Sequence, residues 1–181
     1  MTQKQFETQI KKENQIDYVF NYIISFGVII CSLFFFYKLN FTNWYEIKIT
    51  SENNNNVAPK NLIYIISIAL FVLGLIGILK IEKMYKATIL DGLKDKTING
   101  NLIENCADKF NMTLIKKESE FYKYKYCGKL NNPFDIFFSL NEKGNILVNV
   151  QQTDYNGGIF DFGTSRKVKK NIITEIKNAC R

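Results

Sequence analysis

The sequence YVFNYIISFGVIICSLFFFY at residues 18–37 has no charged side chain and lies between Asp17 and Lys38. A second uncharged stretch, NLIYIISIALFVLGLIGIL at residues 61–79, has a lysine at each end. At about 1.5 Å of rise per residue, a helix of either length covers the hydrocarbon core of a bilayer, which is roughly 30 Å thick. Because both stretches have the length of a span and end at charged residues, they predict two transmembrane helices rather than buried helices of a soluble protein.

Small side chains recur along one side of each predicted span. The pairs are Ser25 with Ser32 and Gly27 with Cys31 in the first, and Ser67 with Gly74 in the second. Small side chains let two helix backbones approach closely in a membrane, so we expect the spans to pack as a hairpin. Neither span contains an ionisable residue, and this favours an anchor over a transport path.

Lysines near the ends of the spans predict the orientation. Segments rich in lysine stay in the cytoplasm, and eight lysines flank the pair of spans while three lie in the loop between them. We therefore expect both termini in the cytoplasm, the loop outside, and a location in the cell (cytoplasmic) membrane. The flanking lysines are Lys4, Lys11, Lys12, Lys80, Lys83, Lys86, Lys94 and Lys96, and those of the loop are Lys38, Lys48 and Lys60.

Charge and hydropathy divide the chain into six segments. They are a cytoplasmic N-terminal segment at residues 1–17, the first transmembrane helix at 18–37, an external loop at 38–60, the second transmembrane helix at 61–79, a connector at 80–97 and a soluble α+β domain at 98–181. The connector is predicted as a polar helix over residues 83–96. From about residue 85 onward, we expect the chain to fold as an independent unit.

The soluble domain is predicted as an antiparallel meander with helices covering one face. Alternation of apolar and polar residues predicts the strands, and NEKGN at residues 141–145 predicts a hairpin turn between two of them. Apolar residues at helical spacing predict a helix at each end, with Ser165 as the N-cap of the last one. The expected elements are a helix at 101–111, strands at 113–117, 121–128, 134–140 and 146–152, a short further strand at 159–162, and a helix at 165–180.

Composition excludes several kinds of chemistry. The chain has no histidine and four cysteines, and no two of these cysteines form a C-x-x-C motif. Without histidine there is no Ser-His or Cys-His nucleophile pair, and the commonest zinc ligand is missing. The sequence predicts no cofactor and no metal site, and the cysteines are expected to be reduced thiols. Asp154 and Asp161, near the glycine pair at 157–158, are expected to form or cap a turn.

Two neighbouring strands carry residues that suggest catalysis. PFD at residues 133–135 opens one strand, and ILVNVQ at residues 146–151 forms the next. This pattern resembles the restriction-endonuclease-like core, in which an Asp on one strand and an acid-or-Gln-x-Lys on the next bind a divalent metal. Some members of that family carry two membrane spans before the core. Here Asn149 and Gln151 occupy the positions of the second acid and the lysine, so the resemblance implies either a membrane-tethered enzyme or its inactive relative.

Basic residues of the soluble domain offer a binding surface, in a chain of net charge +7. We single out Lys123 and Lys125, which alternate with tyrosines in one strand, and Lys169 and Lys170 on the last helix. An ordinary solvated face is one interpretation. Anionic lipid headgroups, worth about 1 kcal/mol per charge near the surface, and an acidic protein are the others, both ahead of nucleic acid.

These observations favour a non-catalytic, membrane-anchored protein whose cytosolic α+β domain binds a protein partner. An immunity or assembly-accessory role suits such a chain. The alternative is the membrane-tethered restriction-endonuclease-like enzyme or its inactive relative, for which Asp135 is the candidate acid.

Overall fold

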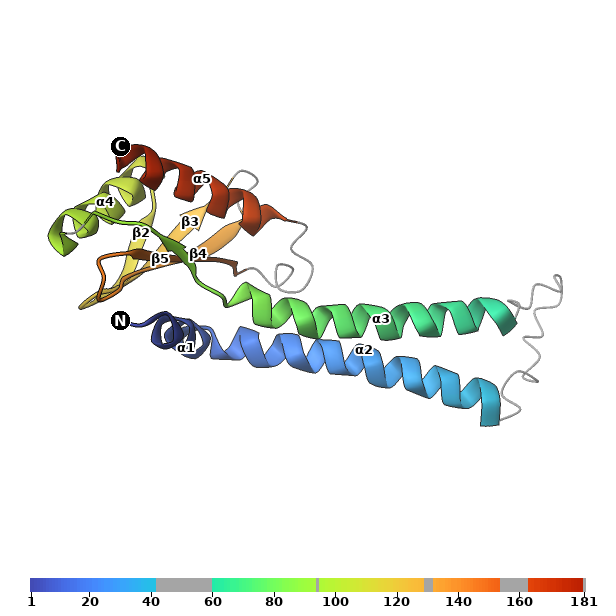
Figure 1. The fold of residues 1–181 in the computed structure, drawn as a ribbon. Helices are drawn as coiled ribbons and strands as arrows, with labels where there is room; N and C mark the ends of the chain where they lie inside the picture. Colours follow the sequence, from blue (N-terminus) through green and yellow to red (C-terminus); the bar gives the residue numbers. More distant parts are fainter. Residues whose placement is uncertain (42–59, 94, 129–131, 154–162, 181) are drawn as a thin grey trace. The chain divides into compact units, whose positions relative to one another are not determined.

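A computed structural model gives the structure of residues 1–41, 60–93, 95–128, 132–153 and 163–180 (Figure 1). The chain forms two compact units. One consists of Met1–Tyr18 together with Ile81–Arg181, and the other is Val19–Lys80. The external loop at 38–60 except Lys38 to Phe41 and Lys60, the predicted strand at 159–162, and Asp154 and Asp161 lie outside the described residues.

The unit at Val19–Lys80 is formed by two long apolar helices, α2 (Gln15–Phe41) and α3 (Lys60–Met84). Both are long and apolar enough to cross a membrane, and both extend beyond the uncharged stretches at 18–37 and 61–79. The Ser32 hydroxyl donates to the Ser67 carbonyl over 2.6 Å. A Cβ atom on Gly74 would lie 3.0 Å from the Ser25 carbonyl oxygen, so the two backbones come close at this point.

Only part of the predicted helix contact is correct. Ser25, Ser32 and Ser67 are buried between the helices, as the spacing of small residues predicts. Gly27 and Cys31 do not take part, because no heavy atom lies within 4 Å of a Cβ placed on Gly27, and Cys31 is exposed. The contact therefore follows the seven-residue spacing in α2 and not the pair four residues apart.

The other unit contains a five-stranded antiparallel sheet of order β1-β5-β4-β3-β2. The strands are β1 (Thr88–Leu90), β2 (Thr113–Glu118), β3 (Phe121–Cys127), β4 (Pro133–Leu140) and β5 (Ile146–Gln152). The helices are α1 (Gln3–Glu13), α4 (Lys96–Lys109) and α5 (Thr164–Ala179). The predicted α+β meander is confirmed for β2 to β5. The sequence missed β1, which lies inside the stretch predicted as a polar helix.

Two predicted helix starts are wrong. Helix α4 begins at Lys96 rather than at residue 101, because the Asp95 carboxylate accepts from the Thr97 amide over 2.7 Å and caps an earlier turn. Asn99 is buried in this helix, and its side-chain amide donates to the Gly144 carbonyl over 2.7 Å. Helix α5 begins after Gly163, whose φ is 90°, and not at Ser165.

One face of the sheet packs against α4 and α5. In the β4–β5 hairpin the partners are Ile136 with Val150, Phe138 with Val148 and Leu140 with Ile146, as the alternation predicts. All six side chains are buried in one cluster with Ile103 of α4 and Ile172 of α5. Burial raises the pKa of the Cys106 thiol in this core to about 12, which fits an unreactive thiol.

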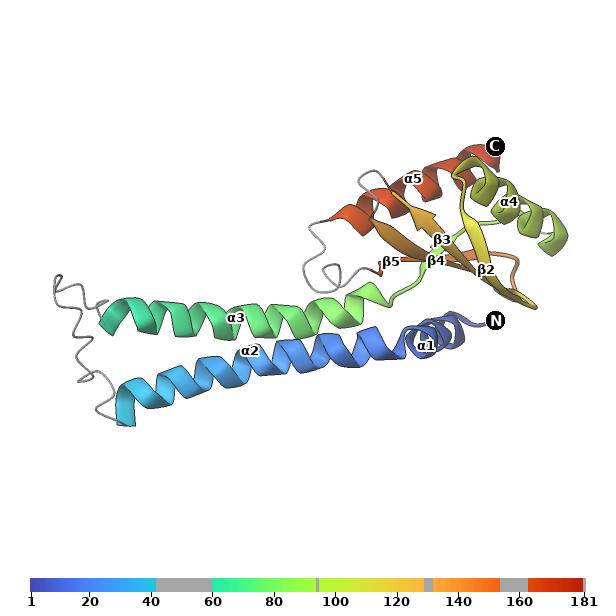
Figure 2. The ribbon, with the colours of Figure 1, turned by 180° about the vertical axis from the view of Figure 1, so that it is seen from behind.

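Helix α1 covers the opposite face of the sheet (Figures 1 and 2). Phe6 and Ile10 are completely buried, and the Phe6 ring meets Phe121 edge-on with 6.0 Å between centroids. Thr2 and Gln5 form a capping box at the start of α1. The compact unit therefore includes residues that the sequence assigned to a separate N-terminal segment, 1–17, and to the connector, 80–97.

Candidate functional site

A cluster of polar side chains is buried on the face of the sheet that α1 covers. Lys123 of β3 and Asp135 of β4 form an ion pair of 2.8 Å, with 14% and 11% of their side-chain surfaces exposed. The Lys123 ammonium also lies 3.4 Å from the Asn14 amide oxygen. The Asn14 amide nitrogen in turn donates to the Gln151 amide oxygen over 2.5 Å. This network connects Asn14, which follows α1, to the adjacent strands β3, β4 and β5.

The two strands of the nuclease-like pattern are adjacent, as the resemblance implies. Asp135 and Gln151 are direct partners across β4 and β5. However, Asp135 is neutralised by Lys123, and the Asn149 amide nitrogen donates to the carbonyls of Met84 and Lys86 over 2.7 and 3.0 Å. Within the described residues, no group of three His, Cys, Asp or Glu side chains could hold a metal ion. A divalent metal needs several oxygen ligands, and the Asp135 carboxylate is already held by Lys123.

The four lysines singled out from the sequence do not form one surface. Lys125 and Lys170 are exposed, whereas Lys123 is largely buried in its ion pair and Lys169 is half-buried on α5. Tyr122 belongs to the core under α5. Because successive side chains of a strand point to opposite faces, Lys123 and Lys125 lie on the other face of the sheet. The expectation of an exposed Lys123 is wrong because α1 comes from the far end of the sequence to cover it.

On α5, the basic residues gather at the start of the helix. Arg166, Lys167 and Lys170 are exposed, and no acidic residue lies in the first turn. Within the described part of the chain, the one ion pair of α5 joins Glu175 to Lys109 of α4 over 2.7 Å. The four cations at 166, 167, 169 and 170 therefore form a basic surface that pairs with no carboxylate of the described residues.

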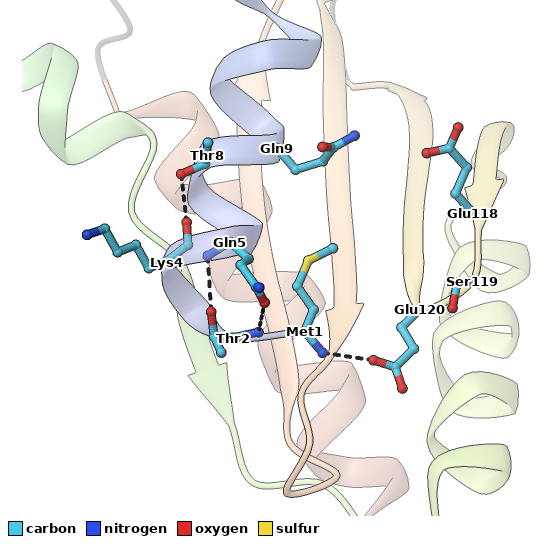
Figure 3. A pocket seen from close by; sticks show the side chains of 9 residues that line it. All are labelled: Met1, Thr2, Lys4, Gln5, Thr8, Gln9, Glu118, Ser119 and Glu120. Atoms are coloured by element: carbon cyan, nitrogen blue, oxygen red, sulfur yellow. Dashed lines mark hydrogen bonds and ion pairs between the residues drawn. The ribbon is translucent and has the colours of Figure 1, made fainter.

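An open groove of about 690 Å³ lies between α1 and the turn joining β2 to β3 (Figure 3). Amide side chains of Gln5 and Gln9 line one wall, and Glu118 and Glu120 line the other. The N-terminal ammonium and Lys96 both pair with Glu120, at 2.8 and 2.5 Å, and their hydrogen bonds lower the pKa of this carboxyl below its usual value. Acidic and amide groups thus face one another across the groove.

Strand β2 forms the edge of the sheet beside this groove. Its only strand partner in the described structure is β3, and the register shifts between Leu114 and Lys116. Leu114 and Ile115 are 49% and 54% exposed, although both are large apolar side chains in a strand. The sequence predicted this strand but not its place at the edge. The run of two lysines directly after two apolar residues is a signal of an edge strand that could have been used.

Comparison with known proteins does not assign the chain to a family. No protein-family model matches it, and no curated protein sequence matches it.

Proposed function

We propose that this chain is a membrane-anchored, non-catalytic protein whose α+β unit binds a protein partner at the edge strand β2. The single observation that carries the proposal is the position of β2 at the edge of the sheet, where Leu114 and Ile115 are exposed. An immunity or assembly-accessory role, in which one protein holds another at the cytoplasmic membrane, suits this arrangement.

The apolar surfaces of α2 and α3 support membrane anchoring. Large side chains such as Ile30 and Ile65, each 64% exposed, face away from the other helix. Exposing so much apolar surface to water along two helices of this length would be energetically unfavourable, whereas lipid tails would solvate it. The eight-to-three distribution of lysines then favours cytoplasmic termini. A reporter inserted at Asn54 should be active only outside the cell, and activity only inside would contradict this orientation.

Strand addition is the binding mode that the edge of β2 favours. An edge strand offers unpaired backbone N–H and C=O groups, and an extended segment of a partner can complete their hydrogen bonds. Leu114 and Ile115 provide apolar contacts for its side chains. Lys116 is already paired with Glu13 over 2.7 Å and Lys117 with Glu104 over 2.7 Å, so their charges repel a partner less than free lysines would.

The nuclease-like alternative has less support from the geometry. Asp135 would have to leave Lys123 before it could bind a metal, and α1 would have to leave the sheet to admit a substrate. A divalent-metal-dependent nuclease activity that Asp135→Asn abolishes would favour that alternative.

The proposal is tested by placing a photo-crosslinking residue at Leu114 in the full chain in its native membrane. We expect one protein adduct of defined size, which an Ile115→Lys substitution should remove by adding a charge at the edge. A crosslinker at the exposed Asn105 of α4 is the matched control and should give no such adduct. Equal adducts from both positions, or an adduct that Ile115→Lys leaves unchanged, would contradict strand addition at β2.

A further inference from the structure

The basic cluster of α5 consists of Arg166, Lys167, Lys169 and Lys170. Three of these side chains are exposed, and Lys169 is half-buried. None of the four pairs with a carboxylate within the described part of the chain, where other lysines such as Lys96, Lys116 and Lys117 do. Burial without an anionic neighbour lowers the pKa of Lys169. Among the described residues, the cluster therefore holds positive charge that no carboxylate pairs with.

The position of the cluster at the N-terminal end of α5 does not stabilise this helix. The N-terminal end of a helix carries partial positive charge from its free N–H groups, and cations are favourable at the other end. In α5 the four cations occupy the first two turns, where no acidic residue offsets them, and Lys177 is the basic residue of the last turn. An anion outside the fold would relieve this unfavourable arrangement.

The start of α5 lies at the end of the unit from which the chain passes into α2 and α3. At that end, β5 contacts Asn14, which precedes α2, through Gln151, and contacts Met84, the last residue of α3, through Asn149. Figures 1 and 2 show the first turn of α5 at the same end of the unit as the last turn of α3. The cluster thus lies at the end of the unit where the chain leaves it for α2 and returns to it from α3.

We infer that the basic cluster of α5 binds the anionic phospholipid headgroups of the membrane that α2 and α3 anchor. The inference rests on the proposed membrane anchoring but not on the proposed partner at β2. Tethering holds headgroups at high local concentration, so a weak surface attraction is enough for contact. The charge of the cluster matches an anionic membrane surface, and the tether supplies that surface without a second macromolecule.

Amine footprinting of the full chain in lipid nanodiscs tests the inference. Acetylation rates of Lys167 and Lys170 are compared in nanodiscs of neutral phosphatidylcholine and in nanodiscs with added anionic phosphatidylglycerol. We expect both lysines to react about fivefold more slowly with the anionic lipid, the equivalent of about 1 kcal/mol per basic residue near such a surface. Added salt should reverse the effect, because it screens the attraction. Lys143, exposed in the turn at the far end of β5, is the internal control and should not change.

Hydrogen exchange of the α5 amides provides a second readout. Exchange should be slower with phosphatidylglycerol in the native chain, and the difference should vanish when Arg166, Lys167, Lys169 and Lys170 are all changed to Gln. Equal acetylation rates in the two lipids, or equal changes at Lys143, would overturn the inference. Protection by inorganic phosphate in neutral nanodiscs would also overturn it, because the cluster would then bind small anions. Failure of the chain to enter nanodiscs would instead contradict the membrane anchoring itself.

Discussion

On the face of the sheet under α4 and α5, the inward side chains of β4 are all apolar, whereas the face under α1 mixes rings with charged and amide groups. Phe134, Ile136, Phe138 and Leu140 form the first face of β4. On the second face, the ring of Phe137 lies beside Phe121 at 6.0 Å, while Asp135 pairs with Lys123. The first face gains stability from apolar area alone. The second also depends on specific partners, because a buried charge or amide is costly when its partner leaves.

The largest expected effect comes from placing a charge in the apolar face. Val148 is fully buried there, so Val148→Asp should abolish the fold of the sheet-containing unit. An unpaired buried charge costs several kcal/mol, a large part of the roughly 5–15 kcal/mol that stabilises a domain. Hydrogen exchange of β3, β4 and β5 in the detergent-solubilised chain should rise to unprotected rates, while α2 and α3 remain protected.

Phe6→Asp is the matched substitution on the other face. Phe6 is equally buried, but it belongs to a helix that can leave the sheet as a whole. We expect the amides of α1 to lose protection while those of α4 and α5 keep theirs. If Phe6→Asp unfolds the unit as completely as Val148→Asp does, the two faces form one cooperative core and the contrast between them is wrong.

An intermediate effect is expected from the ion pair under α1. Lys123→Met or Asp135→Leu alone leaves a buried charge without its partner and should lower the free energy of unfolding by about 3–5 kcal/mol. The double variant should recover most of this loss, because two apolar side chains can replace a buried pair. Denaturant unfolding of the four chains measures the coupling. Single losses below about 1 kcal/mol would mean that the pair behaves like an exposed surface pair.

The two faces also differ in how far the sequence could predict them. The partners of Val148 and Val150 follow from simple alternation and from a turn with glycine, both of which are local signals. The environment of Lys123 depends on Phe6 and Asn14, which are more than a hundred residues away in the sequence and separated from it by two apolar helices. No pattern within a short stretch of sequence could predict the contact between Lys123 and the N-terminal segment. A lysine that alternates with tyrosines was therefore expected to be exposed, and residues 1–17 were predicted as a separate cytoplasmic segment.

The placement of the candidate nuclease residues was predicted in part. The resemblance placed Asp135 and Gln151 on neighbouring strands, and the pairing of β4 with β5 confirms this. The sequence could not show that a lysine from a third strand would neutralise the acid, because the order of strands in a sheet is a property of the whole fold. The basic cluster of α5, by contrast, depends on one helix, and its positions were visible in the sequence.

The smallest expected effect is a pH dependence at the rim of the α1 face. Hydrogen bonds from Lys96 and from the N-terminal ammonium lower the pKa of Glu120 in the folded chain. A carboxyl whose pKa is lower when folded stabilises the fold above its unfolded pKa and loses that contribution as the pH falls through its folded pKa. The contribution should be below about 1 kcal/mol, because the pair is partly solvated. Melting of the native chain and of Glu120→Gln should therefore differ slightly at pH 7 and converge as the pH falls below the folded pKa of Glu120. Because Glu120 holds the start of α1 and lies away from α5, acid should speed hydrogen exchange in α1 before it does so in α5. Equal acid sensitivity of both helices would show that the rim contacts do not distinguish the two faces.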